Sequence, residues 1–134
     1  MIEKLNHVAI VVPDLVKAKT LYEDVLGARV SDIQNLPEHG VLTVFVNLGN
    51  AKIELLHPIG KNSPVSKFLK QNPNGSIHHI CYEVASIEEV VRRLSKKGLR
   101  VLGDGTPKMG AHGNPVVFLH PKDFVGTLIE LEEV

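Results

Sequence analysis

The chain has 134 residues, 43% of them hydrophobic, which is enough to bury an ordinary core in one domain or two small fused modules. Its 15 basic residues balance 15 acidic ones, so the formal net charge of +0 gives no electrostatic reason to expect nucleic acid or an anionic membrane as a partner. Cys81 is the only cysteine, which excludes an intramolecular disulfide and favours a small buried residue over a catalytic thiol.

No apolar run approaches the roughly 20 residues that span a bilayer. The first residues lack the composition of a signal or transit peptide, and strand-like sequence begins within a few residues of Met1. We therefore expect a soluble cytoplasmic protein that has no membrane partner.

The first half of the chain predicts one strand, one helix and three further strands. The opening strand, residues 5–12, ends at Pro13, and Asp14 is a favourable N-cap for the helix that follows. Apolar residues at helical spacing continue to Gly27, which is typical of a residue just past a helix end. The three further strands are predicted at residues 29–33, 41–48 and 52–57.

A connecting helix is predicted from Ser63 as its N-cap to the residues before Pro73. The second half then repeats the order of the first. Ser86 and Glu89 form a capping box at the start of its helix, and Gly98 ends that helix. The remaining predicted elements are strands at residues 77–84, 99–102, 116–120 and 127–132, with a glycine-rich loop at residues 103–114.

Each half thus has the order β-α-β-β-β, and several stretches correspond between the halves. Gly27 corresponds to Gly98, and residues 53–55 (Ile-Glu-Leu) correspond to residues 129–131. We predict an α+β fold of two tandem βαβββ modules that face a shared metal-binding cleft within one compact domain. The predicted parts are a first module at residues 1–62, a connecting helix and linker at 63–76, and a second module at 77–134.

The duplication also pairs polar residues. Period two puts His7 and His79 on the less apolar face of the first strand of each half. Glu54 and Glu130 lie on the last strand of each half and point away from flanking apolar residues that can pack on helices. Two imidazoles and two carboxylates form a ligand set that suits a divalent cation with open positions for water or substrate.

Lys108, His112 and Lys122 form a further candidate group because they give local positive charge around the glycine-rich loop. Such a group could contact a phosphate or carboxylate of a small molecule. The other histidines favour structural roles. His78, for example, shares the apolar face of its strand and is expected to pack or to form hydrogen bonds away from the metal.

Six stretches of the sequence carry a resemblance to a known family, namely residues 5–10, 36–41, 54–58, 78–81, 110–113 and 118–123. On these stretches the whole chain resembles the methylmalonyl-CoA epimerases of the vicinal oxygen chelate superfamily, which also contains glyoxalase I and the extradiol dioxygenases. In this resemblance His7, His79 and Glu130 match the family's metal ligands, and Glu54 completes the set. Some epimerases carry Gln at the position of Glu54 and a carboxylate, proposed as a base, where this chain has Thr43.

The resemblance implies an isomerase that inverts C2 of methylmalonyl-CoA through an enolate, in propionate metabolism. Because the twofold arrangement puts a glutamate on each side of the substrate, we assign the two base roles to Glu130 and Glu54. The resemblance also implies a divalent metal ion, Co²⁺ ahead of Mn²⁺, Ni²⁺ and Zn²⁺, and a homodimer. The CoA tail of the thioester substrate would lie outside the cleft, toward Lys108, His112 and Lys122. The metal ligands in this resemblance are His7, Glu54, His79 and Glu130.

Three alternative functions rank below the epimerase. A glyoxalase I-type isomerase (lactoylglutathione lyase) uses the same four-ligand arrangement and proton transfer. An extradiol dioxygenase would use His7, His79 and Glu130 as a facial triad on Fe(II), and Glu54 as a fourth ligand argues against it. A non-enzymatic binding protein of the same superfamily would not need four ligands.

Overall fold

The computed structural model describes all 134 residues, which form two compact units. His7–His78 is called the first unit, and Met1–Asn6 together with His79–Val134 is called the second unit. The strands β1 (Ile2–Val11) and β6 (Ser76–Val84) each begin in one unit and end in the other. None of the helices is both long and apolar enough to cross a membrane.

The first unit is built on a mixed sheet. The strand β4 (Val41–Asn47) pairs antiparallel with β5 (Lys52–Pro58), which pairs in parallel with β1. Two short strands, β2 (Arg29–Val30) and β3 (Gln34–Leu36), both pair with β4. The strand β3 was not predicted from the sequence, so the first half has one strand more than the expected order.

The helix α1 (Leu15–Thr20) begins as predicted, because the Asp14 side chain accepts a hydrogen bond of 3.0 Å from the backbone N–H of Lys17. It continues as wider π-helical turns, η1 (Leu21–Val25), and the chain then turns at Gly27, which has a φ of 68°. Glycine adopts this left-handed conformation without steric cost.

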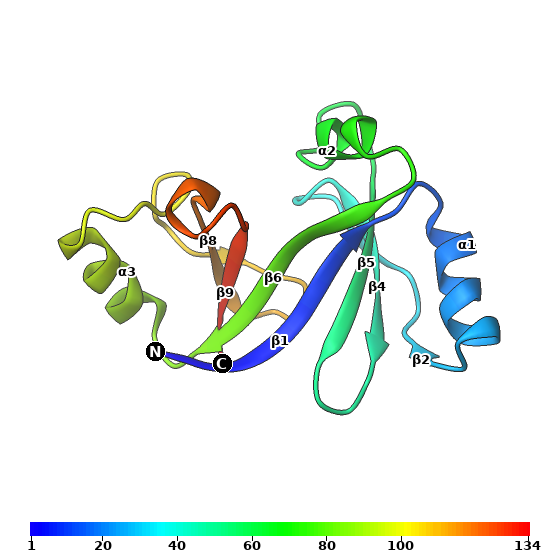
Figure 1. Cartoon of the computed structure of the whole chain (residues 1–134), viewed down its shortest axis with the longest axis horizontal. Helices are drawn as coiled ribbons and strands as arrows, with labels where there is room; N and C mark the ends of the chain where they lie inside the picture. The colour runs from blue at the N-terminus through cyan, green and yellow to red at the C-terminus, as the bar shows by residue number, and fades with distance from the viewer. The chain divides into compact units, whose positions relative to one another are not determined.

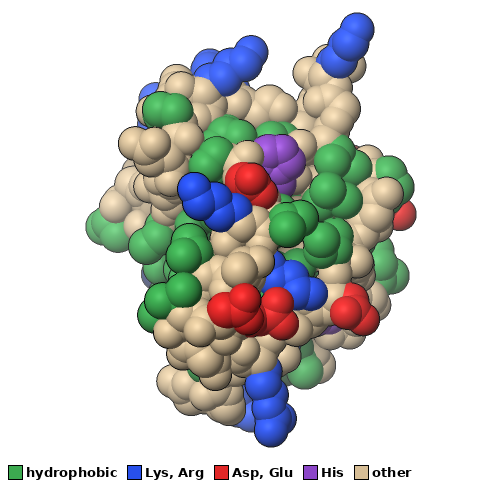
Figure 2. All heavy atoms as spheres, turned by 90° about the vertical axis from the view of Figure 1, so that its right-hand side faces the viewer, with side chains coloured by type: hydrophobic (Ala, Val, Ile, Leu, Met, Phe, Trp, Pro, Cys, Tyr) green, Lys and Arg blue, Asp and Glu red, His purple; other side chains and the backbone are tan.

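One face of the first sheet packs on this helix (Figure 1). Val44, Val46 and Leu55 are buried against Leu15, and the partly buried Ile53 joins the same cluster. The prediction that Ile53 and Leu55 pack on a helix is therefore confirmed. The outer side of the helix is exposed, and Figure 2 shows apolar side chains at the surface of the face that carries it.

The other face of the first sheet is partly covered by α2 (Ser66–Gln71). Val65 and the helix residues Phe68 and Leu69 pack against Ala9, Val11, Val41 and Leu56. The predicted N-cap at Ser63 is wrong, since the helix begins at Ser66 and has no side-chain cap. Ser63 instead closes the turn before the helix, where its carbonyl accepts a 3.1 Å hydrogen bond from the N–H of Ser66.

The second unit has a sheet in which β9 (Ile129–Glu133) lies between β6 and β8 (Pro115–Leu119), parallel to β6 and antiparallel to β8 (Figure 1). The predicted strand at residues 99–102 is reduced to an isolated bridge between Val101 and Leu119. The predicted loop contains a short strand, β7 (Lys108–Met109), that pairs with β8. Both differences arise because pairing with β8, rather than local sequence, decides these short segments.

The helix α3 (Ile87–Lys96) covers one face of this sheet and confirms the predicted cap. The Ser86 hydroxyl accepts a 3.2 Å hydrogen bond from the N–H of Glu89. The apolar stripe Ile87, Val90 and Leu94 is buried against Val84, Val117, Leu119 and Leu131. The repeated order of strand, helix and further strands confirms the α+β class.

Replacing Leu131 by Ala is expected to destabilise the protein by about 2–5 kcal/mol, because a leucine that is 1% exposed leaves a cavity in the core under α3. Urea unfolding of the variant measures this free energy. Leu48→Ala serves as the control, since Leu48 is 52% exposed and its truncation should change stability little. Equal losses in the two variants would contradict the described core.

A surface ion pair fixes the connection between β8 and β9, which includes the short helix η2 (Pro121–Asp123). The Arg100 guanidinium donates two hydrogen bonds of 3.0 Å to the Asp123 carboxylate, and the Arg100 backbone N–H donates a third of 2.9 Å. These bonds, first of all those from the guanidinium, lower the pKa of Asp123 from 3.8 to about 2.

This pKa predicts how stability depends on pH. Because the folded pKa of Asp123 lies below the ordinary value, its contribution should be complete above about pH 4 and should disappear as the pH falls toward 2. The difference in unfolding free energy between the natural protein and Asp123→Asn, measured in urea across this range, should shrink accordingly. Asp24→Asn, at an exposed position, is the control. A difference that stays constant down to pH 2 would contradict the ion pair.

Candidate active site

The first unit brings His7 and Glu54 together on the sheet face opposite α1. His7 lies on β1 and Glu54 on the parallel strand β5, and the side chains are 4% and 7% exposed. The His7 Nε2 atom lies 3.3 Å from the Glu54 Oε1 atom. The face predicted for both residues from period two is the face that they occupy.

Two residues of the strand β4 contact this pair. The hydroxyl of the fully buried Thr43 lies 3.0 Å from Glu54 Oε2 and 3.1 Å from the carbonyl oxygen of Leu55, and its single proton can be donated to either. The ring of Phe45 meets the His7 imidazole edge to face, with the ring centroids 5.8 Å apart. Thr43 thus helps to orient the Glu54 carboxylate, and Phe45 restricts the ring of His7.

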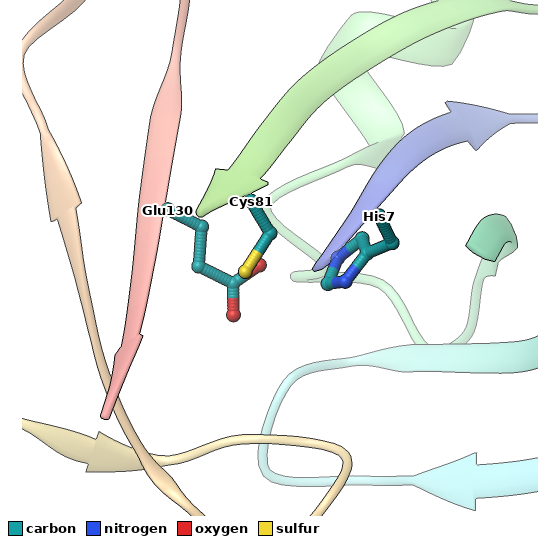
Figure 3. Close-up of side chains that lie close together, drawn as sticks. All are labelled: His7, Cys81 and Glu130. Atoms are coloured by element: carbon teal, nitrogen blue, oxygen red, sulfur yellow. The ribbon is translucent and has the colours of Figure 1, made fainter. Parts of the chain in front are cut away.

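The second unit contains the corresponding pair, His79 on β6 and Glu130 on β9. The His79 Nε2 atom lies 2.9 Å from Glu130 Oε2, and both side chains are less than one-tenth exposed. The ring of Phe118 meets His79 edge to face at 5.4 Å. Cys81 is opposite Glu130 in the register of β6 and β9, and Figure 3 shows these two side chains on the neighbouring strands. Cys81 is fully buried.

Each unit therefore holds one imidazole and one carboxylate on parallel strands, next to the edge of a phenylalanine ring. A neutral imidazole nitrogen and a carboxylate oxygen are both ordinary ligands of first-row divalent metals. Burial also favours this use, because a buried carboxylate needs a cation or hydrogen-bond donors. The residues that the sequence predicts as metal ligands, His7, Glu54, His79 and Glu130, fit a divalent cation chemically.

Other histidines have the structural contacts expected of them. His78 packs edge to face on Phe68, with the ring centroids 4.8 Å apart. The Nδ1 atom of His57 lies 2.9 Å from the carbonyl oxygen of Val12. The ring of His120 accepts a 3.1 Å hydrogen bond from the backbone N–H of Lys122 and so caps η2.

The predicted tail-binding residues Lys108, His112 and Lys122 lie in three different segments of the second unit. Lys108 is exposed on β7, where it lines a groove of about 640 Å³. The groove is bounded by the start of α3, including Glu88 and Arg92, and by Gly105, Pro107 and Met109. His112 lies in the turn between β7 and β8, and Lys122 is exposed in η2.

One buried residue next to the site was missed in the sequence, namely Glu132. Its Oε1 atom accepts hydrogen bonds of 3.1 Å from His112 Nδ1 and from Asn114 Nδ2. Burial raises the pKa of Glu132, but the hydrogen bonds from His112 and Asn114 outweigh this effect and hold the pKa below its usual range. Period two along β9 could have found Glu132, because it shares the face of Glu130.

Comparisons with known proteins identify the family. Residues 6–118 match the profile of the glyoxalase/bleomycin resistance protein/dioxygenase superfamily. The chain is 59% identical over 134 residues to the ethylmalonyl-CoA/methylmalonyl-CoA epimerase of Cereibacter sphaeroides, with 100% of both chains covered. It is 58% identical over 130 residues to the mitochondrial methylmalonyl-CoA epimerase of Homo sapiens, which covers 97% of this chain and 73% of the human one. The chain belongs to the methylmalonyl-CoA epimerase family.

Solved structures of epimerases have the same fold. A variant of the Streptomyces coelicolor methylmalonyl-CoA epimerase, in complex with 2-nitronate-propionyl-CoA, superposes with a TM-score of 0.90 at 30% identity. The match covers 99% of this chain and 98% of that one. The family predicted from the sequence and its fold are thereby confirmed, and the glyoxalase I-type alternative is not favoured.

Proposed function

We infer that this protein is an isomerase that interconverts (R)- and (S)-methylmalonyl-CoA by removing the proton at C2 and returning one to the opposite face. The observation that carries this inference is the matched pair of buried carboxylates, each beside a histidine, at equivalent strands of the two units. His7 lies 3.3 Å from Glu54, and His79 lies 2.9 Å from Glu130. Inversion at a carbon requires a base on one side and an acid on the other, and a duplicated carboxylate can supply both.

We assign four ligands to one divalent cation, His7, Glu54, His79 and Glu130, with Co²⁺ ahead of Mn²⁺, Ni²⁺ and Zn²⁺. The two pairs supply two nitrogen and two oxygen atoms, which leaves positions for water or substrate. When bound, the cation would act as a Lewis acid toward negative charge that develops on the thioester oxygen.

The proton transfers are assigned to Glu130 and Glu54. The C2 hydrogen of the substrate lies between a thioester carbonyl and a carboxylate, so its removal spreads charge into an enolate. One glutamate takes this proton, and the other delivers one from the opposite side. Thr43 supports the assignment for Glu54, because its hydroxyl lies within hydrogen-bond distance of Glu54 Oε2 and can hold that carboxylate in one orientation.

The CoA tail is assigned to the surface that carries Lys108, His112 and Lys122. Both lysines are exposed, so their ammonium groups are accessible to the phosphates of CoA, where charge-assisted hydrogen bonds are strong. The Cereibacter relative is also named for ethylmalonyl-CoA. Ethylmalonyl-CoA is therefore the appropriate second substrate to test on this protein.

We further propose a homodimer and a role in propionate metabolism, both of which follow from the resemblance, together with the cytoplasmic location expected from the sequence. Exposed apolar side chains such as Val25 and Leu26, which are 71% and 67% exposed, are available for contact with a second copy. Sedimentation equilibrium would test the dimer, and a single species of 14.7 kDa would contradict it.

The proposed activity is tested by incubating the protein with Co²⁺ and either (R)- or (S)-methylmalonyl-CoA in D₂O. We expect one deuterium at C2 and the same final mixture of epimers from both starting materials, read by proton NMR and mass spectrometry. If no deuterium appears while the glutathione hemithioacetal of methylglyoxal is converted, the protein is a glyoxalase I-type isomerase and the proposal fails.

A further inference from the structure

The groove of about 640 Å³ in the second unit lies between the start of α3 and the edge strand β7. The apolar part of its lining consists of Ile87, Val91, Pro107, Met109 and Pro115. Small-molecule sites in proteins are concave, mostly apolar and about 300–1,000 Å³ in volume, with a few polar groups that orient the ligand. The groove has the size and the apolar walls of such a site.

Two cationic side chains line the same groove from opposite walls, Arg92 on α3 and Lys108 on β7, and both are exposed. Neither side chain forms a hydrogen bond or an ion pair with another residue of the chain. The pKa of Asp104 is lowered mainly by hydrogen bonds to Thr106 and least by the charge of Lys108, so Asp104 does not fix this ammonium group. Guanidinium and ammonium groups beside apolar walls favour a ligand that carries phosphate, to which they donate charge-assisted hydrogen bonds.

Two carboxylates in the lining restrict the kind of anion that the groove can accept. The Oε2 atom of Glu133 accepts a 2.8 Å hydrogen bond from the backbone N–H of Ile87, so this oxygen is already used at the start of α3. Glu88 is exposed in the first turn of α3 and faces the groove without an ion pair. A purely anionic ligand would be repelled by Glu88, whereas a ligand with N–H or O–H groups can donate to it.

An adenosine phosphate combines all the groups that this lining requires. Its phosphates match Arg92 and Lys108, and the flat base offers an apolar surface to Val91 and Pro107. The amino group of adenine and the ribose hydroxyl are donors for Glu88. CoA ends in such a group, adenosine 3′,5′-bisphosphate, so the proposed substrate carries the moiety that fits the groove.

The groove also lies within reach of a thioester bound at the active-site pair of the second unit. Lys108 is opposite Val116, which is opposite Glu132, two residues along β9 from Glu130. Strands are about 4.8 Å apart and two residues of a strand span about 7 Å, so the backbones of Lys108 and Glu130 are about 12 Å apart. An extended pantetheine arm is longer than this distance. Because β7 ends the sheet, the arm can pass its outer edge from the active-site face to the side of α3.

We propose that the groove between α3 and β7 binds the adenosine 3′,5′-bisphosphate end of the CoA thioester, with Arg92 and Lys108 on its phosphates. This inference rests on the proposed function. It adds Arg92, on a helix in the middle of the second half, to the residues assigned to the CoA tail. It also gives the α3 side of the second unit a role in binding, while the opposite face carries His79 and Glu130.

The binding test titrates adenosine 3′,5′-bisphosphate into the protein by isothermal calorimetry. We expect the affinity to fall about tenfold in Arg92→Gln and in Lys108→Gln, the effect of one lost charge-assisted hydrogen bond. Arg93→Gln is the matched control, because Arg93 is the next residue of α3, is exposed and does not line the groove. It should bind with the natural affinity. Equal affinities in Arg92→Gln and the natural protein, or an equal loss in Arg93→Gln, would overturn the proposal.

The kinetic test compares methylmalonyl-CoA with methylmalonyl-pantetheine, which lacks the nucleotide. In Arg92→Gln the KM for methylmalonyl-CoA should rise about tenfold, and the KM for the pantetheine thioester should stay within twofold of the natural value. The kcat for either substrate should be unchanged, because the groove does not touch C2. A rise of both KM values by the same factor, or of neither, would refute the assignment of the groove to the CoA tail.

The two tests together separate this proposal from the proposed function. If the bisphosphate binds through Arg92 but the natural KM is the same for both thioesters, the groove is a site for a free nucleotide and its assignment to CoA is wrong. If deuterium enters C2 but the bisphosphate does not bind, the groove is wrong and the epimerase activity stands. If the bisphosphate binds through Arg92 but no deuterium enters C2, the proposed function fails, and with it the assignment of the groove to the substrate.

Discussion

Replacing Glu130 by Gln is expected to lower the rate of deuterium incorporation at C2 by about 10²–10⁴-fold, the usual contribution of a general base. Gln keeps the size of the side chain and one oxygen that can bind a metal, but it cannot accept the C2 proton. The rate is measured by NMR in D₂O at saturating methylmalonyl-CoA, with the metal content of each sample determined beside it.

The companion variants separate the roles of the carboxylates. Glu54→Gln should slow epimerisation by a similar factor if Glu54 is the second base, whereas full activity would make it a metal ligand only. Glu3→Gln, at an exposed position in the second unit, should have no effect. Exchange that survives in Glu130→Gln at the natural rate would remove Glu130 as an essential base.

Replacing His79 by Ala is expected to weaken metal binding by at least about 100-fold. Even the replacement of a residue that only forms a hydrogen bond to a metal ligand commonly lowers metal affinity about 10–100-fold. His79 is buried and its Nε2 atom lies 2.9 Å from Glu130, so its loss removes a ligand and a partner of the carboxylate together. His7→Ala should weaken binding to a similar degree if the two pairs are equivalent. Competition with a chromophoric chelator measures both affinities.

His78→Ala is the matched control for this loss. His78 is the direct neighbour of His79, but its ring packs on Phe68. The variant should therefore bind metal with the natural affinity, although packing against α2 is weakened. Unchanged affinity in His79→Ala, or an equal loss in His78→Ala, would contradict the assignment of ligands.

The sequence was sufficient to predict the pairs because their positions depend on simple periodicity. Alternation along β1 and β6 puts His7 on the face away from α1 and His79 on the face away from α3, and the apolar neighbours of Glu54 and Glu130 fix the faces of β5 and β9. The N-terminal caps of α1 and α3, Asp14 and Ser86, were predictable for a similar reason, because a cap needs only local hydrogen bonds.

What the sequence could not predict depends on contacts between distant segments. The strands β3 and β7 are two or three residues long and exist because β4 and β8 offer them backbone partners. The start of α2 at Ser66 is set by the packing of Val65, Phe68 and Leu69 on β1 and β5, which overrides the local signal at Ser63. The local sequence pattern determines where long amphipathic helices and strands form, whereas short ones form where neighbouring segments of the fold offer them contacts.

This chain differs from some epimerases at two neighbouring positions of the proposed active site, Thr43 and Glu54. Some epimerases carry a carboxylate at the position of Thr43 and Gln at that of Glu54. In this chain the hydroxyl of Thr43 lies 3.0 Å from Glu54 Oε2, on the neighbouring strand. The carboxylate of Glu54 on β5 therefore lies next to the side chain at position 43 on β4, where those epimerases carry their carboxylate. This proximity is a further reason for proposing Glu54 as the second base.

Titration of Co²⁺ into metal-free protein, with deuterium exchange at C2 of methylmalonyl-CoA followed at each step, tests most directly whether the four residues bind one cation. If His7, Glu54, His79 and Glu130 bind one cation together, the exchange rate should rise in proportion to added Co²⁺ and stop rising at one equivalent per chain. Exchange at the full rate without metal, or a rise that continues to two equivalents because each pair binds its own ion, would contradict it.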